Sequence, residues 1–311
     1  MTGLSTRPLG HSAIEVTEVG LGCNNFGRRL DLDGTRAVVD ACLEVGITFF
    51  DTADIYGGQG ASEALLGQVM EGRWDEVVLA TKFGMDMGDG ETARGSAAYV
   101  RSAVQASLRR LRADTIDVYW YHRPDGVTPI AETLQALHEL VEAGTVRAIG
   151  ASNFSAAQLQ EADDVARERG MTRFTALQNE YSLLKREVEA EVLPLCERLN
   201  VGFVPYFPLA SGLLTGKYRR GAAAPPGTRL AGRDRVASEE QFARVDALSQ
   251  YARERGVSLT DVAIGALLAQ PAVSSVIAGA TKPEQVASNA AAANWKPSAE
   301  DLAELRSLLA E

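Results

Sequence analysis

The stretch "FFDTADIYGGQGASEALLG", residues 49–67, determines how the rest of this chain is interpreted. An apolar run typical of a buried strand ends at Asp51, and Tyr56 follows shortly after it, directly before two glycines. Asp51 alone would be an ordinary turn residue, because aspartate often ends a strand by hydrogen-bonding to nearby backbone. However, the pattern of an apolar run followed at once by polar side chains recurs along the chain, and a single turn does not explain that.

Short apolar runs of this kind alternate with amphipathic segments of helical length. The runs span residues 19–22, 47–50, 77–80, 116–121, 147–150, 174–177, 201–205 and 275–278. The clearest helical segments span residues 34–46, 98–113, 129–144 and 155–170. Eight strand–helix alternations favour a closed barrel of parallel strands over an open sheet. We therefore predict an α/β fold, a single (β/α)8 TIM barrel domain over residues 1–311.

Two further segments are predicted to decorate this barrel. Residues 7–19, "RPLGHSAIEVTEV", have the pattern of an N-terminal β-hairpin that plugs the bottom of the barrel. Residues 218–235 are rich in Gly, Pro, Ala and Arg and follow the seventh strand. Because loops of this length without regular structure are uncommon in compact domains, we predict a functional loop that clamps a cofactor.

The composition limits the classes of partner. The chain has 311 residues with a formal net charge of −10, which argues against nucleic acid or an anionic membrane as the main partner. The cysteines, Cys23, Cys42 and Cys196, show no disulfide or metal-ligand spacing. No apolar leader and no run of about 18 apolar residues is found. We predict a cytoplasmic protein without a metal, and leave open whether it forms a homo-oligomer.

The polar residues that follow the runs are expected to converge. In a (β/α)8 barrel the carboxyl ends of all strands face one pocket. The residues at these ends are Asn24, Asn25, Asp51, Tyr56, Thr81, Lys82, His122, Ser152, Asn153, Gln178, Asn179, Tyr206, Gly279, Thr281 and Lys282.

Four of these side chains suit proton transfer to an oxygen. Tyrosine has a pKa near 10 and is a poor acid at neutral pH, but a neighbouring ammonium such as Lys82 would lower that pKa. Asp51 can pair with Lys82 and offset its buried charge, and His122 can donate a hydrogen bond to a substrate oxygen. We predict that Tyr56, Asp51, Lys82 and His122 are catalytic and interconvert a carbonyl and an alcohol.

Such a reaction needs a hydride donor. The glycine-rich fingerprint of a Rossmann unit does not follow any early strand, so a nucleotide would lie across the barrel mouth instead. Ser152, Asn153 and Gln178 could hydrogen-bond the nicotinamide carboxamide, and the ring of Tyr206 could stack on the nicotinamide. Lys217 and Arg229, in or near the long loop, could bind the phosphates.

Several motifs together resemble the aldo-keto reductase family over essentially the whole chain. They are "FDTADIYG", "TKFG", "DVYWYHRPD", "GASNF", "LQNEYSLL", "YFPLASGLLTGKY" and "IAGATKPEQVASN". The segments "PLASGLLTGKY" and "GATKPEQVASN" are most similar to the branch that contains potassium-channel β-subunits and their bacterial relatives. The resemblance implies an (α/β)8 barrel that binds NADPH across its C-terminal face. It also implies that Tyr56 is the general acid/base, assisted by Asp51, Lys82 and His122.

The same resemblance implies a set of cofactor contacts. These are Gly22, Cys23, Asn24, Asp51, Ser152, Asn153, Gln178, Tyr206, Phe207, Pro208, Leu209, Ala210, Ser211, Gly212, Lys217, Arg229, Gly279, Thr281, Lys282, Gln285 and Asn289. The chain departs from the branch at Asn24, where tryptophan is usual, and at Ser288, where glutamate is usual. Gln285 stands where some other branches carry an arginine for the 2′-phosphate. A preference for NADP(H) over NAD(H) would then depend on Thr281, Lys282, Lys217 and Arg229.

The substrate is expected in a pocket beside the catalytic residues. Its predicted lining is Asn25, Phe26, Tyr56, Met85, His122 and Arg123. The sequence does not distinguish an aldehyde, a ketone or a sugar.

Two other functions remain open from the sequence. One is a binding module that senses the nicotinamide redox state, as the channel-subunit resemblance permits; His122 favours turnover, because that branch often has asparagine there. The other is an aldolase that uses Lys82 as a Schiff base, which Asp51 and Tyr56 argue against.

Overall fold

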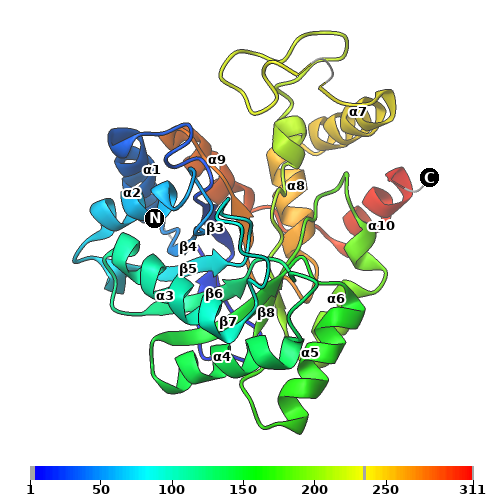
Figure 1. The fold of residues 1–311 in the computed structure, drawn as a ribbon. Helices are drawn as coiled ribbons and strands as arrows, with labels where there is room; N and C mark the ends of the chain where they lie inside the picture. Colours follow the sequence, from blue (N-terminus) through cyan, green and yellow to red (C-terminus); the bar gives the residue numbers. More distant parts are fainter. Residues whose placement is uncertain (1–3, 234–235, 310–311) are drawn as a thin grey trace.

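The computed structural model describes residues 4–233 and 236–309, and its centre is a sheet of parallel strands (Figure 1). Within these residues the sheet has eight strands in the order β10-β3-β4-β5-β6-β7-β8-β9. They are β3 (Val19–Gly22), β4 (Phe49–Asp51), β5 (Val78–Phe83), β6 (Ile116–Tyr121), β7 (Val146–Ser152), β8 (Ala176–Gln178), β9 (Gly202–Phe203) and β10 (Val276–Ala278).

Backbone hydrogen bonds join the two ends of this sheet. Phe203 N donates to Ala272 O at 2.7 Å, Ser274 N donates to Phe203 O at 2.9 Å, and Ile277 N donates to Pro205 O at 3.3 Å. These bonds connect the β9 region to the segment that leads into β10. The sheet therefore curls into the (β/α)8 barrel that the alternation of runs predicted, and that fold class is confirmed.

Helices cover the outside of the barrel (Figure 1). They are α1 (Leu32–Val45), α2 (Ala61–Met70), α3 (Ala97–Leu111), α4 (Ile130–Glu142), α5 (Ala156–Glu168), α6 (Val192–Leu199), α8 (Leu259–Leu268) and α9 (Pro283–Ala292). Two more, α7 (Glu239–Glu254) and α10 (Ala299–Leu308), pack on each other beside α8. Short 3₁₀ helices are η1 (Trp74–Glu76), η2 (Glu187–Glu189) and η3 (Ala210–Thr215). Local sequence sets several helix starts, because serine caps α5, α7, α8 and α10 with complete capping boxes.

The predicted hairpin is present and closes one end of the barrel. Strands β1 (Thr6–Pro8) and β2 (Glu15–Thr17) pair antiparallel. Leu9, Ile14 and Val16 belong to the same buried cluster as side chains from the barrel interior. Gly10 lies against backbone of residues 175, 200 and 202, which stand at the amino ends of β8 and β9. The hairpin thus plugs the end opposite the carboxyl ends of the strands, which leaves the other end for a site.

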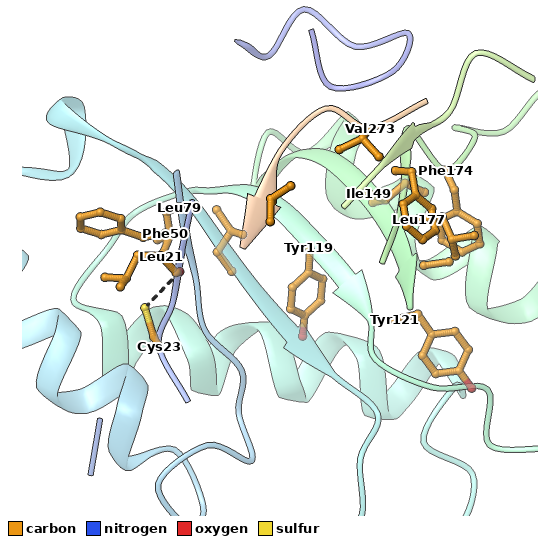
Figure 2. Close-up of a cluster of buried hydrophobic side chains, with 14 of the residues drawn as sticks. Leu21, Cys23, Phe50, Leu79, Tyr119, Tyr121, Ile149, Phe174, Leu177 and Val273 are labelled. Carbon is orange, nitrogen blue, oxygen red and sulfur yellow. Dashed lines mark hydrogen bonds between the residues drawn. The ribbon is translucent and has the colours of Figure 1, made fainter. Parts of the chain in front are cut away.

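Alternation along each strand sorts the side chains into two layers. Phe50 and Leu79 point outward, where they join Tyr119 in the core between strands and helices (Figure 2). Phe49 and Trp120 fill the barrel interior. A polar residue that stands two positions after an inward-pointing apolar residue therefore also points inward. It lies closer to the carboxyl end of the strand, at the open end of the barrel.

A missing side chain on one strand makes room for the largest interior side chain. A Cβ at Gly150 would come within 2.3 Å of the Trp120 ring, so only glycine fits beside this indole. The two residues face each other directly, since Trp120 on β6 is paired with Gly150 on β7.

The strand limits differ from those predicted where polar residues extend a strand. Strand β5 runs to Phe83 and β7 runs to Ser152, so Lys82 and Ser152 lie inside strands rather than after them. Pairing with neighbouring strands decides these limits, and an apolar run does not report it. The predicted loop 218–235 is irregular through residue 233 and extends beyond the barrel beside α7 (Figure 1). Its last two residues, 234 and 235, lie outside the described residues.

Candidate active site

A cavity of about 1090 Å³ opens at the carboxyl ends of the strands. It exceeds the usual volume of a small-molecule site, about 300–1,000 Å³, so a dinucleotide and a substrate can share it. The predicted residues that line it are Gly22, Asn24, Asn25, Asp51, Tyr56, Met85, His122, Arg123, Asn153, Gln178, Tyr206, Phe207, Pro208, Leu209, Ser211, Gly212, Lys217, Arg229, Gly279, Thr281, Lys282, Gln285 and Asn289.

Lys82 lies at the centre of the predicted catalytic group. Its side chain is completely buried, and its Nζ donates to Asp51 Oδ2, to Thr52 O at 2.9 Å and to the Tyr56 hydroxyl at 3.4 Å. The register of the sheet explains the contact: Asp51 on β4 is paired with Ala80 on β5, and Lys82 is the next residue on the same face. Three of the four predicted catalytic residues are therefore in direct contact.

The electrostatics of this group favour a charged lysine beside a neutral tyrosine. Burial lowers the pKa of Lys82, but the charge of Asp51 and the hydrogen bonds to Asp51 and Tyr56 outweigh it and the net direction is upward. Burial raises the pKa of Tyr56, and the Lys82 ammonium offsets only part of this increase. The sequence led us to expect a tyrosine pKa below its ordinary value. The structure corrects this, because the hydroxyl lies in a poorly solvated place, and Tyr56 holds its proton at neutral pH.

His122 completes the group from the end of β6. Its ring meets the Tyr56 ring edge-on, with 5.8 Å between centroids. Burial, with the charges of Lys82 and Arg123, holds the pKa of His122 well below its usual value, so the ring is neutral. Its Nδ1 has no hydrogen-bond partner among the described residues. A neutral imidazole has one donor and one acceptor nitrogen, so it can donate to a ligand without carrying charge.

The polar side chains on the next strands hold one another and the catalytic group. The Tyr206 hydroxyl donates to Asn153 Oδ1 at 2.7 Å, and Asn153 Nδ2 donates to His122 O at 2.9 Å. Gln178 Nε2 donates to Asp51 Oδ1 at 3.2 Å. Asn153 has a φ of 60°, in the left-handed region that asparagine adopts more readily than most residues with a side chain. Asn153 thus has a bracing role that the sequence did not predict.

The segment after β9 carries unusual backbone. Phe207, Ala210 and Ser211 have φ values of 55°, 45° and 58°. Left-handed residues often cluster at ligand sites, where the surrounding structure holds them. Gly212 continues the segment, and a Cβ there would come within 2.6 Å of Lys217 Nζ. The ammonium of Lys217 therefore lies directly over this part of the cavity wall.

Cationic side chains gather around the cavity although the chain as a whole is acidic. They are Arg28, Arg29, Arg123, Lys217, Arg229 and Lys282. In the described part of the chain none of them has a carboxylate within 4.0 Å. Such a wall suits an anionic ligand.

Two of these cations were missed at the sequence level. Arg28 and Arg29 follow the predicted pocket residue Phe26 after one glycine, and the run "GRR" was the available signal. Arg29 donates to Gly227 O, which ties the loop after β3 to the long loop. Arg229 lies over the Phe207 ring, 4.4 Å from its centroid, and burial with the charges of Arg28 and Arg29 lowers its pKa.

Five predicted site residues do not line the cavity. Lys82 and Ser152 lie behind Tyr56 and Asn153, and Ala210 is in η3. Phe26 was expected beside the substrate, but the backbone turns after Cys23 and both side chains are completely buried in the core. Cys23 Sγ lies 3.7 Å from Leu21 O (Figure 2).

Within the described residues, no group of three or more His, Cys, Asp or Glu side chains is arranged to hold a metal ion. None of the described helices is long and apolar enough to cross a membrane.

Comparison with known proteins agrees with this fold. The model of the Aldo/keto reductase family matches residues 18–310, so the chain belongs to this family of oxidoreductases, as its motifs predicted. A rice protein described as a probable voltage-gated potassium channel subunit beta is 37% identical over 295 residues, which are 90% of this chain and 88% of that protein. An Arabidopsis thaliana protein with the same description is 35% identical over 303 residues, 93% and 91% of the two chains. YrpG of Bacillus subtilis, an uncharacterized oxidoreductase, is 36% identical over 289 residues, 89% and 87% of the two.

Proposed function

We propose that this protein is an NADP(H)-dependent oxidoreductase that interconverts an aldehyde or ketone and the corresponding alcohol. The observation that carries the proposal is the contact chain Asp51–Lys82–Tyr56, with His122 beside it, at the floor of a dinucleotide-sized cavity. Neither a metal nor a nucleophilic cysteine is needed for this chemistry. The cytoplasmic location remains a prediction.

The cavity walls fit a nicotinamide dinucleotide. Asn24 Oδ1 is a buried acceptor with no partner among the described residues, which suits an amide N–H of a ligand. Lys217 and Arg229 lie near the segment after β9 and suit the diphosphate. Helix α9 begins at Pro283, directly after Lys282, and the Lys282 ammonium suits a further phosphate. The bound dinucleotide would supply the hydride.

Tyr56 would provide the proton in the reducing direction. Its raised pKa keeps the hydroxyl protonated at neutral pH, and the Lys82 ammonium at 3.4 Å stabilises the phenolate that forms when the proton leaves. Asp51 balances the charge of Lys82 in this buried place. Neutral His122 would donate a hydrogen bond to the same substrate oxygen. In the oxidising direction Tyr56 would take the proton back.

The test is a panel of aldehydes, ketones and sugars with NADPH or NADH. Turnover is measured as the loss of reduced-nicotinamide absorbance. Turnover of at least one carbonyl, faster at low NADPH than at low NADH, is expected. Tight binding of the dinucleotide with no turnover of any carbonyl would contradict the proposal.

That second outcome would support a binding module that reports the nicotinamide redox state. The observation favouring it is that two relatives are described as potassium channel β-subunits. His122 argues for turnover, since it gives the site a second hydrogen-bond donor for the substrate oxygen.

A further inference from the structure

A second polar cluster lies behind the wall that carries the catalytic residues. Asp54 lies between Asp51 and Tyr56, and its backbone N donates to Lys82 O at 3.1 Å. Asp51 and Tyr56 line the cavity, but Asp54 does not. It is only 2% exposed, and its Oδ1 has no hydrogen-bond partner among the described residues. Asp54 is therefore attached to the catalytic turn, residues 51–56, but its carboxyl faces a different environment.

The arginines near Asp54 already have carboxylate partners. Glu63 of α2 is completely buried and accepts from Thr81 Oγ1 at 2.5 Å and from Arg110 Nε at 2.6 Å. Arg94 forms ion pairs with Asp86 and Asp89. No cation is left to neutralise Asp54 on this side of the barrel wall among the described residues.

The remaining groups around Asp54 are two phenols, and neither forms a hydrogen bond to Asp54 Oδ1. The hydroxyl of Tyr119, from β6, is buried without a partner among the described residues, and the charges of Asp54 and Glu63 help to raise its pKa. The Tyr99 hydroxyl, from α3, accepts from Arg94 Nη1 at 2.7 Å. The groups that face Asp54 are thus one carboxylate, two neutral phenols and two arginines that have other partners.

An ionised Asp54 would be costly in this place. Burial and the neighbouring Glu63 raise the pKa of Asp54 to about 7, although Arg110, the Ile55 backbone N–H and Arg94 act in the opposite direction. A buried carboxyl that has one backbone donor and no cation paired with it is more stable in its neutral form.

We propose that Asp54 is a positioning residue, which holds the catalytic turn when protonated and displaces the Tyr56 hydroxyl from Lys82 when it ionises. The link is short: the backbone of Asp54 is bonded to Lys82, and Tyr56 N donates to Ala53 O at 3.1 Å. A carboxylate that moves toward solvent or Arg110 would pull this turn with it. The inference rests on the proposed function, because it assigns the consequence to Tyr56.

The first test is the pH profile of kcat with saturating cofactor and carbonyl. Wild-type activity is expected to fall as pH rises through about 7, by up to about 30-fold at pH 8.5, where such a group is about 97% ionised. Asp54→Asn keeps the shape without the charge and should remove this fall. Asp114→Asn, at an exposed aspartate, is the matched control and should keep the wild-type profile.

A second variant should act in the opposite direction. Glu63→Gln removes the negative charge that opposes ionisation of Asp54, so the fall should move to lower pH. Infrared difference spectra between pH 6 and 8.5 provide a direct measurement. The band of a protonated carboxyl should be lost in wild type and in Asp114→Asn, and should be absent from Asp54→Asn.

The outcomes separate the two claims. Identical pH profiles for wild type and Asp54→Asn, or no titrating carboxyl band, would overturn the inference and leave the proposed function intact. A wild-type protein that reduces no carbonyl at any pH would overturn the proposed function, and with it the positioning role.

Discussion

Asp51 and Asp54 lie on the same turn, and both are almost completely buried, at 1% and 2% exposure. Asp51 faces the cavity and accepts from Lys82 and Gln178. Asp54 faces the helices, where Glu63 holds Arg110 and Asp54 Oδ1 has no partner in the described chain. Burial raises the pKa of both carboxyls, but only Asp51 has an ammonium against it. The comparison shows that the partner, rather than the depth of burial, decides which buried aspartate can act as a fixed negative charge.

The largest effect is expected at Tyr56, whose hydroxyl contacts Lys82, the ion-pair partner of Asp51. Tyr56→Phe removes the hydroxyl and keeps the ring, so carbonyl reduction should fall by about 10²–10⁴-fold, the usual contribution of general acid catalysis. Steady-state kinetics with saturating NADPH measure this loss, and fluorescence titration should show unchanged cofactor affinity. A variant as fast as wild type would show that this turn has no catalytic role.

The next prediction removes the cation beside Asp51, so that the surroundings of Asp51 become similar to those of Asp54. Lys82→Met leaves Asp51 buried without its cation, and breaking a buried ion pair on one side costs about 3–5 kcal/mol in unfolding free energy. Most turnover should also be lost, since the Tyr56 phenolate loses its stabilising charge, while cofactor binding is largely retained. Urea unfolding followed by circular dichroism gives the free energy. Wild-type stability or a wild-type kcat would contradict the ion-pair interpretation.

The third prediction concerns stability and Asp54. Its folded pKa, about 7, is above the ordinary value of 3.8, so the folded state binds the extra proton and the stability that Asp54 contributes falls as pH rises from about 4 to 7. Asp54→Asn lacks this dependence and should be more stable than wild type by about 2–4 kcal/mol at pH 8.5. Urea unfolding at pH 5 and 8.5 measures it. Equal pH dependence in wild type and variant would show that Asp54 has an ordinary pKa.

The smallest effect is expected at a charge of the opposite sign, a single arginine of the cavity wall. Arg229 lies in the cavity wall, and one charge-assisted contact is worth about 1.5–3 kcal/mol, so Arg229→Gln should weaken NADPH binding by about 10–150-fold. Arg219→Gln, at an exposed arginine of the same loop, is the matched control. Fluorescence titration compares the variants. Equal losses for both would mean that general attraction, rather than a contact by Arg229, holds the cofactor.

The barrel and the proximity of the four predicted catalytic residues were both predictable from local patterns. Eight apolar runs separated by helical segments restrict the fold strongly, because parallel strands need a crossover between each pair. In such a barrel the residues after each run share one end, so Asp51, Tyr56, Lys82 and His122 could be placed together before any contact was known.

The details that failed depend on neighbours that no local pattern reports. Phe26 follows two cavity residues but turns into the core, because the backbone folds back after Cys23. Asn153 and Gln178 line the cavity as expected, but the sequence did not show that their amides also brace His122 and Asp51 from other strands. The cluster of cations needs both the loop after β3 and the long loop, and these meet only in the folded chain.

The tertiary structure alone decided the charge states of Asp51 and Asp54. The order of residues was sufficient to put two aspartates on one turn, because consecutive positions fix spacing and alternation along the backbone. It was not sufficient to assign their roles, since Lys82 arrives from β5 and Glu63 from α2. A pKa responds to solvent and to charges within a few ångströms in space, whatever their separation along the chain. For that reason Asp51 acquired a cation and Asp54 a second carboxylate only when the barrel closed around them.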